Sequence, residues 1–264
     1  MSEYIYRQIM DLLSAGKSAA LCSIIASSGS APRHEGTKML VYPDGNFIGT
    51  VGGGEIENRI RQEALEVIQS HHGRVLKYSM VDPKRGDPGT CGGTVEVYIE
   101  PILPREKVIV IGGGHVGKAV AHLAKWLGFS VAVSDDRLEF CTPEANPDAD
   151  EFYPVAMKDL PTATNITAST YLVLTTRGSN VDVAGLTPLL STQAAYIGVI
   201  GSKRRWATTK KALLEQGVSP ERLGIIYSPM GLELNAETPE EIAVSIMAEI
   251  IMKRNDGTGN TMKD

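Results

Sequence analysis

Apolar and polar positions follow two different patterns along the chain, and the difference divides it into two halves. In the second half, short apolar runs typical of buried parallel strands alternate with stretches whose apolar residues recur at helical spacing. The predicted strands are 107–111, 130–134, 171–175, 195–200 and 224–227, and the predicted helices are 116–127, 205–216 and 239–254. Strands that alternate with helices predict a parallel sheet, so this half is expected to be a Rossmann-type α/β domain.

The first half predicts a smaller α+β domain. Its apolar positions recur at helical spacing in two segments and are strand-like in others, and Pro43-Asp44-Gly45 between two strand-like runs predicts a hairpin. The predicted helices are 4–15 and 56–70, and the predicted strands are 19–26, 37–42, 46–50 and 94–100. The PILP segment at 101–104 is expected to break the last strand, so we predict domains at 1–103 and 104–255 and a disordered tail at 256–264.

Composition and charge exclude several classes of partner. Over 264 residues, 42% are hydrophobic and 22% are charged, which is enough for a packed core without disulfides. The net charge of -5 argues against a nucleic-acid partner, and the chain has neither a signal-peptide pattern nor a run of about 18 apolar residues for a membrane span. Three cysteines far apart in sequence predict no disulfide framework, which favours a reducing cytoplasmic setting.

A glycine motif predicts a nucleotide site in the second half. Gly112, Gly114 and Gly117 stand in GxGxxG register between a predicted strand and a predicted helix, and Asp135 ends the next strand. Such glycines allow a tight turn and close approach to a pyrophosphate, while the acid holds ribose hydroxyls. The alternative is a glycine turn that only packs the helix against the strand. Asp135 and its acidic neighbour favour NAD or another dinucleotide without a 2′-phosphate, although Arg137 weakens this inference.

Other polar residues are expected near the same edge of the sheet. His115 lies where a phosphate would pass, and we interpret it as a contact and not as a catalyst. Arg177, Gly201, Ser202 and Lys203 follow later strands, at the end where open α/β sheets bind ligands. The cations that begin at Lys203 oppose the helix dipole, which favours a bound anion over a solvated first turn.

The first half contains glycine-rich loops and one cysteine of interest. Arg33 and the triglycine Gly52, Gly53 and Gly54 lie in loops whose backbone N–H groups are suited to anions. Cys91 stands between glycines with cations close in sequence, a setting that favours an accessible thiolate, a candidate molybdenum or sulfur contact, over a buried thiol. Cys91 is therefore the candidate reactive residue, and we assign no other catalytic group.

Taken together and in this order, these loops resemble the XdhC/CoxI family of molybdenum-hydroxylase accessory proteins over nearly the whole chain. The first-half motifs are GSAPRHEGTKM at 29–39, GTVGGGEIE at 49–57 and CGG at 91–93. The second-half motifs are TRG at 176–178 with Asp182, IGVIGSKRR at 197–205 and PMGLELNAETPEEIAVSIMAEI at 229–250. The pattern leaves open whether Glu55 or Glu57 is the functional acid of the second motif.

The resemblance implies a non-catalytic maturation factor. Such a chaperone binds molybdenum cofactor of the molybdopterin type, presents it for sulfuration by a cysteine desulfurase, and inserts it into a client like xanthine dehydrogenase. It is also expected to be a homodimer. Two alternatives stay open at this point: an NAD-dependent oxidoreductase, indicated by the glycine motif, and a sulfur carrier that uses Cys91.

Overall fold

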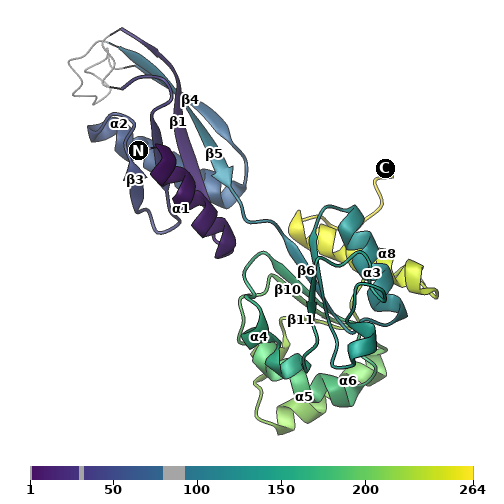
Figure 1. The fold of residues 1–264 in the computed structure, drawn as a ribbon. Coiled ribbons are helices and arrows are strands. Elements are labelled where there is room, and N and C mark those ends of the chain that lie inside the picture. Colours follow the sequence, from purple (N-terminus) through teal and green to yellow (C-terminus); the bar gives the residue numbers. More distant parts are fainter. Residues whose placement is uncertain (1, 30–32, 80–92, 264) are drawn as a thin grey trace. The chain divides into compact units, whose positions relative to one another are not determined.

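The computed structural model describes residues 2–29, 33–79 and 93–263 and divides the chain into two compact units, Met1–Pro104 and Arg105–Asp264 (Figure 1). The first unit contains a five-stranded antiparallel sheet with the order β3-β2-β1-β5-β4. Its elements are α1 (Ser2–Ser14), β1 (Ala19–Ser28), β2 (Lys38–Val41), β3 (Phe47–Gly49), α2 (Gly54–Ser70), β4 (Arg74–Ser79) and β5 (Thr94–Ile102). The predicted hairpin is confirmed, because Val41 pairs with Phe47 across the Pro-Asp-Gly turn.

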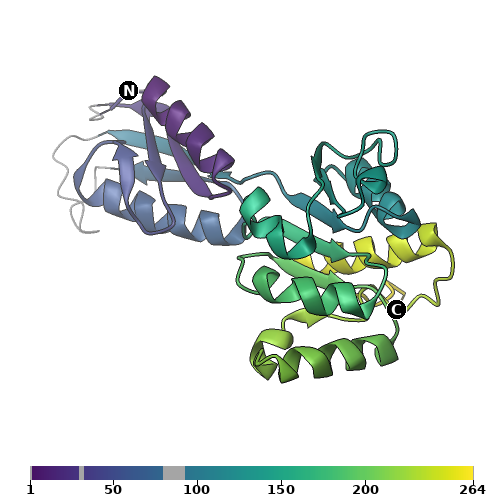
Figure 2. The same ribbon diagram turned by 60° about the horizontal axis from the view of Figure 1, so that its bottom comes forward.

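Helices α1 and α2 cover opposite faces of this sheet (Figure 2). The central strand β1 serves both, because successive side chains of a strand point to opposite faces. Ala20 and Cys22 pack in the core beneath α2, whereas Ala19 and Leu21 pack with Ile5 of α1. This sharing explains why the segment 19–26 is a continuous apolar run and not an alternating one.

The predicted break at Pro101 is wrong. Strand β5 continues through Pro101 to Ile102, with Pro101 opposite Ala20 of β1. On the other side, β4 pairs with β5 only as far as Ile99. Pro101 therefore lies at an edge position, where a missing N–H is tolerated in a sheet.

The second unit is a six-stranded parallel sheet with the order β11-β10-β9-β6-β7-β8. Its strands are β6 (Lys107–Ile111), β7 (Ser130–Ser134), β8 (Glu151–Tyr153), β9 (Thr170–Leu174), β10 (Tyr196–Val199) and β11 (Ile226–Tyr227). Its helices are α3 (His115–Trp126), α4 (Leu160–Ala163), α5 (Ser179–Leu189), α6 (Lys203–Glu215), α7 (Pro220–Leu223) and α8 (Pro239–Arg254). The predicted Rossmann-type sheet, preceded by a smaller α+β domain, is confirmed.

Two helical layers cover the parallel sheet (Figure 1). Val108 and Val110 of β6 pack on the face covered by α3 and α8, while Ile109 and Ile111 pack on the face covered by α5 and α6. Helix α5 and strand β8 were not predicted, since α5 contains a glycine and a proline and β8 has three residues. Among the described residues, no helix is both long and apolar enough to cross a membrane.

Candidate functional site

Three helices begin at one edge of the parallel sheet. Helices α3, α5 and α6 follow β6, β9 and β10, and parallel strands end at a common edge. Strand β6 lies between β9 and β7, so the order of strands reverses beside it and leaves a crevice outside its carboxyl end. Helix N-termini carry free N–H groups and partial positive charge, so the crevice is suited to an anionic ligand.

The three glycines of the GxGxxG motif differ in what surrounds them. Gly112 has a φ of 111°, and a side-chain carbon there would lie 2.7 Å from the Thr175 carbonyl oxygen. A side-chain carbon on Gly117 would lie 2.0 Å from the Gly112 carbonyl oxygen. Gly114 has an ordinary φ of -72°, and a side-chain carbon there would meet nothing within 4 Å. The outer glycines therefore close the turn, while Gly114 leaves open space in front of the N-terminus of α3.

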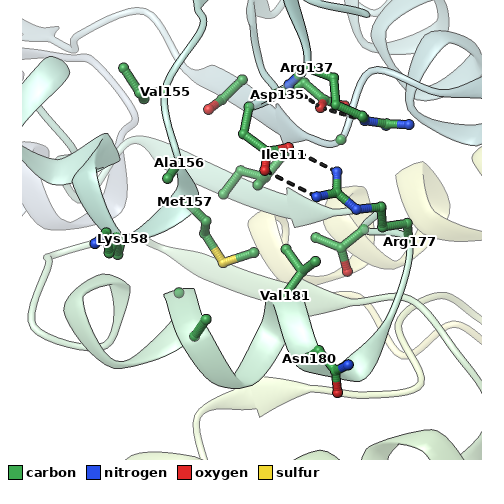
Figure 3. Close-up of a pocket in the computed structure, with 16 residues that line it drawn as sticks. Ile111, Asp135, Arg137, Val155, Ala156, Met157, Lys158, Arg177, Asn180 and Val181 are labelled. Atoms are coloured by element: carbon green, nitrogen blue, oxygen red, sulfur yellow. Dashed lines mark hydrogen bonds and ion pairs between the residues drawn. The ribbon is translucent and has the colours of Figure 1, made fainter.

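A cavity of 330 Å³ opens beside this turn (Figure 3). Its apolar wall consists of Val155, Met157 and Val181, and Met157 points into the space. Gly185 of α5 makes room for Met157, because a side-chain carbon on Gly185 would lie 2.6 Å from the Met157 Cβ. The cavity is bordered by the charged residues Asp135, Asp136, Arg137, Lys158 and Arg177 and the polar residues Ser134, Thr176 and Asn180. An apolar wall with a polar border is typical of sites for small molecules.

Several of these lining residues were not predicted as site residues. Met157 and Lys158 follow the unpredicted strand β8, and Asn180 is the second residue of the unpredicted helix α5. Ser134 is the last residue of a predicted strand, where a serine in an otherwise apolar run was the available signal. The missed residues therefore follow an unpredicted strand, belong to an unpredicted helix, or end a predicted strand.

Asp135 is saturated by donors from its own domain. Its Oδ2 accepts hydrogen bonds from the Gly113 N–H at 2.9 Å and from Arg137 Nη2 at 2.9 Å. Its Oδ1 accepts from the backbone N–H and the Nε of Arg137, both at 3.0 Å. The Arg137 guanidinium also lies 4.0 Å above the Phe140 ring, and the hydrogen bond to Asp135 raises the pKa of Arg137. Asp135 therefore ties the glycine turn to the loop after β7.

Asp136 and Arg177 form a bidentate ion pair that links the loops after β7 and β9. Arg177 Nη1 lies 2.8 Å from Asp136 Oδ1, and Nη2 lies 3.1 Å from Oδ2. The hydrogen bond from Arg177 holds the pKa of Asp136 below its usual value. The side chains of both residues are nearly half exposed, so this pair remains accessible to a ligand.

The cations predicted at the start of α6, Lys203 to Arg205, are partly engaged by the protein itself. Arg205 Nη2 lies 2.7 Å from Oδ2 of the fully buried Asp182 and 2.7 Å from Thr176 Oγ1, which itself donates to Asp182. Ser202 caps α6 by accepting from the Arg205 N–H at 3.2 Å. Lys203 is exposed in the first turn of α6, and Gly201 precedes the cap with a φ of 138°. Arg205 is thus engaged by Asp182 and Thr176, whereas Lys203 and Arg204 remain exposed.

His115 is placed away from the 330 Å³ cavity. It is the exposed first residue of α3 and lines a separate groove of 430 Å³ between α3 and α8. His122 lies in the same groove, where its Nδ1 is 3.0 Å from Asp148 Oδ2. No cluster of three metal-ligating side chains occurs in the described part of the chain.

The loops of the first unit form a second, separate candidate site. Gly52, Gly53 and Gly54 have φ values of 145°, 80° and 65°, and a side-chain carbon at Gly53 or Gly54 would meet nothing within 4 Å. Glu57 holds this loop from α2, because its Oε1 accepts from Thr50 Oγ1 at 2.7 Å and from the Val51 N–H at 3.1 Å. Glu55 instead pairs with Arg59, and Arg33 is exposed. Glu57 is therefore the acid that shapes the glycine loop.

Cys91 lies outside the described residues. The two described cysteines are buried, as predicted for Cys22. Burial raises the pKa of the Cys22 thiol to about 12, and it also raises the pKa of the Cys141 thiol. Cys141 donates to the Val133 carbonyl oxygen at 3.3 Å. Both thiols are therefore neutral packing groups.

Two family models match the chain. The model described as the XdhC Rossmann domain matches residues 108–250, and the model described as the XdhC and CoxI family matches residues 12–79. The chain belongs to the XdhC and CoxI family. The resemblance carried by the glycine-rich loops and the terminal motif is thereby confirmed.

Three relatives of this family member are informative. The uncharacterized protein YqeB of Escherichia coli (strain K12) is 33% identical over 92% of this chain and 45% of its own length. A probable subunit of xanthine dehydrogenase from Bacillus subtilis (strain 168) is 35% identical over 61% of this chain and 47% of its own length. The molybdenum cofactor insertion chaperone PaoD of Escherichia coli (strain K12) is 25% identical over 95% of this chain and 88% of its own length. The chain thus spans about half the length of the first two relatives.

The fold of this family member also occurs in a crystal structure. A protein of Bacillus halodurans, described as a xanthine dehydrogenase, superimposes with a TM-score of 0.52 and 23% identity, covering 96% of both chains. At this identity the likeness establishes the fold alone.

Proposed function

We propose that this family member is an accessory factor that binds molybdenum cofactor and assists its sulfuration and insertion into a molybdenum hydroxylase like xanthine dehydrogenase. The observation that carries the proposal is similarity through both units to a protein named as a molybdenum cofactor insertion chaperone, over 95% of this chain. A second relative, from Bacillus subtilis, is named as a probable subunit of xanthine dehydrogenase. These names support a hydroxylase client as the partner. A cysteine desulfurase as second partner and a cytoplasmic homodimer as the assembly belong to the proposal on the ground of the family resemblance alone.

The chemistry of the described loops supports a phosphate-bearing cargo. A molybdopterin-type cofactor carries a phosphate, which needs N–H donors and nearby cations. The second unit offers the open N-terminus of α3 at Gly114, and the first unit offers the glycine loop held by Glu57. The residues proposed to bind cofactor or nucleotide are Arg33, Gly52, Gly53, Gly54, Gly112, Gly114, His115, Gly117, Asp135, Arg137, Arg177, Gly201, Ser202 and Lys203. Of these, Asp135 acts through the loop that it braces.

Gly114→Val provides the test. A side-chain carbon there meets nothing within 4 Å and needs no unusual φ, so the domain should still fold. A small loss of stability is expected because valine is a poorer N-cap residue than glycine, while the side chain fills the space in front of α3. The variant is expressed with a client molybdenum hydroxylase in cells that lack their own accessory protein. Client activity and sulfurated cofactor content should both fall at least about tenfold, the loss that one blocked contact of about 1.4 kcal/mol produces.

Ala207→Val is the matched control, because it introduces the same side chain at an exposed position of α6. Its client activity should equal that of the unaltered chain. Full activation by Gly114→Val would contradict a role for the α3 N-terminus. Hydride transfer to NAD by the purified protein, without any effect on a client, would instead favour the oxidoreductase alternative.

A further inference from the structure

A Rossmann-type pocket is expected to bind ribose hydroxyls with the acid that ends its second strand. In this chain that acid is Asp135, which directly follows β7. Its side chain is 3% exposed, and its two oxygens already accept four hydrogen bonds from Gly113 and Arg137. An ionised carboxylate has about four acceptor positions, so Asp135 has none left for a ribose.

The neighbouring acid is in the opposite situation. The Asp136 side chain is 43% exposed, lines the 330 Å³ cavity, and accepts one hydrogen bond at each oxygen from Arg177. An ionised carboxylate has about four acceptor positions, so Asp136 keeps acceptor capacity beyond the pair with Arg177. This capacity is what a pair of ribose hydroxyls requires.

Arg177 complements this acid. A guanidinium has about five N–H donors, and those that Arg177 uses in the described structure both go to Asp136. Arg177 immediately precedes Gly178, the cap residue of α5, and it borders the crevice at which α3 also begins. The remaining donors are available to a phosphate, which arginine binds well in a forked geometry.

A buried hydroxyl gives an independent indication of a polar ligand in the cavity. Ser134 is fully buried and lines the cavity, and its Oγ has no hydrogen-bond partner within the described structure. Buried polar groups without a partner are rare, because each loses its hydrogen bonds to water. A polar group of a bound nucleoside would satisfy this hydroxyl.

We propose that the Asp136–Arg177 ion pair is the nucleotide-recognition unit of this pocket, with Asp136 accepting from the ribose hydroxyls, Arg177 binding the adjoining phosphate, and Asp135 acting only as a brace for the glycine loop. The ligand class is a ribonucleoside 5′-diphosphate, either free or as one half of a dinucleotide. The inference rests on the proposed cofactor-binding role of the second unit and specifies how that unit recognises its ligand. The cavity of 330 Å³ is at the small end for ligand sites, which suits one nucleoside.

The experiment is titration calorimetry on the full chain. ADP, GDP, CDP and UDP are compared first, and the best of them is then compared with its 2′-deoxy and 3′-deoxy forms and with its unphosphorylated nucleoside. The unaltered chain should prefer the ribonucleotide over a deoxy form by about tenfold, the worth of a hydrogen bond to a charged acceptor. Asp136→Asn should bring that ratio close to one, and Arg177→Gln should remove the preference for the diphosphate over the nucleoside.

Asp135→Asn and Glu215→Gln are the matched comparisons. Asp135→Asn should lower the melting temperature and keep the ribose preference in the folded protein. Glu215→Gln removes an equal charge from an exposed pair at the far end of α6 and should change neither ratio. If Asp135→Asn does not fold, Asp136→Asn still decides, because a retained ribose preference in that variant overturns the proposal.

Two further results would overturn this inference. One is loss of the ribose preference in Asp135→Asn together with its retention in Asp136→Asn, which would restore the usual assignment. The other is the absence of binding by all four diphosphates at millimolar concentration. A chain that binds no nucleotide and still activates a client would refute this inference and leave the proposed function standing, whereas a chain that binds nucleotide and activates no client would do the reverse.

Discussion

Asp135 and Asp136 are adjacent in the sequence, yet their side chains are 3% and 43% exposed. The sequence alone treats them as two negative charges that repel a 2′-phosphate. In the structure each faces a guanidinium, because Arg137 pairs with Asp135 and Arg177 pairs with Asp136. The repulsion that favoured NAD over a 2′-phosphorylated dinucleotide is therefore largely cancelled.

The cysteines allow a prediction at this scale. A thiol reacts as its thiolate, and burial raises the pKa of Cys22 to about 12 and also raises that of Cys141. A raised thiol pKa means that both groups are neutral at about pH 8. Iodoacetamide at that pH should therefore modify Cys91 in the folded protein long before the other two cysteines. Mass spectrometry of peptides after a short exposure provides the measurement.

The functional counterpart is Cys91→Ala. If the thiolate binds molybdenum or relays sulfur, this variant should remain folded and fail to raise the sulfurated cofactor content of a client. Cys22→Ala is unsuitable as a control because it creates a core cavity. The serine variants Cys22→Ser and Cys141→Ser are therefore used instead, and only their melting temperatures are compared with that of the unaltered chain. Full client activation by Cys91→Ala would mean that the glycine-rich loops act through their backbone.

At the scale of elements, two family motifs form one structural contact. The TRG segment with Asp182 and the GSKRR segment meet where Arg205 of α6 donates to Asp182 of α5 and to Thr176 after β9. Asp182 is fully buried, so its charge needs a partner. This contact fixes the start of α5 and α6 at the carboxyl edge of the sheet, beside the candidate site.

Asp182→Ala should therefore destabilise the protein strongly. Removing one partner of a buried ion pair costs about 3 kcal/mol or more, because the charge of Arg205 is left without its acid. Urea denaturation followed by circular dichroism measures the change. Lys211→Gln breaks the exposed ion pair between Lys211 and Glu215, which lie one turn apart on α6. This variant should lower the free energy of unfolding by less than about 0.5 kcal/mol. Equal stability of the two variants would mean that Asp182 is not held as the structure describes.

At the scale of the molecule, the chain ends with a segment that contributes little to either core. Met262 is fully exposed, and the contacts of this segment reach back to Met252 and Leu232. Deleting residues 256–264 removes no residue of the hydrophobic clusters in either unit. The melting temperature should change by less than about 2 °C, since a loss below about 0.5 kcal/mol shifts a domain of this size by no more.

Differential scanning calorimetry of the shortened chain checks this prediction. The second unit should unfold at its original temperature. A fall of several degrees would mean that the terminal segment docks against α8 more firmly than its exposure indicates.

The sequence by itself determined the elements whose signals are local. The sequence predicted closely the strands that begin at Lys107 and Ser130, the helix that begins at Pro239 with its capping box, and the Pro-Asp-Gly hairpin. Residue spacing, caps and turn residues act within a few positions, so a local pattern is enough to predict such elements. The GxGxxG motif likewise predicted the turn between β6 and α3. Strand β8 and helix α5 were not predicted from the sequence. A three-residue strand and a helix that contains glycine and proline are stabilised by neighbours distant in the sequence.

Only the tertiary structure decided which charges are free. Asp135 is a predicted ribose contact and Arg205 belongs to the cations expected to bind an anion, but in the fold both are engaged by protein partners. Asp136 gains its candidate role because Arg177 arrives from a loop 41 residues away. The physical reason is that a side chain can bind a ligand only with the donor and acceptor positions that the rest of the protein leaves unused. Which positions are left unused depends on contacts between residues distant in the sequence, and a local sequence pattern does not show them.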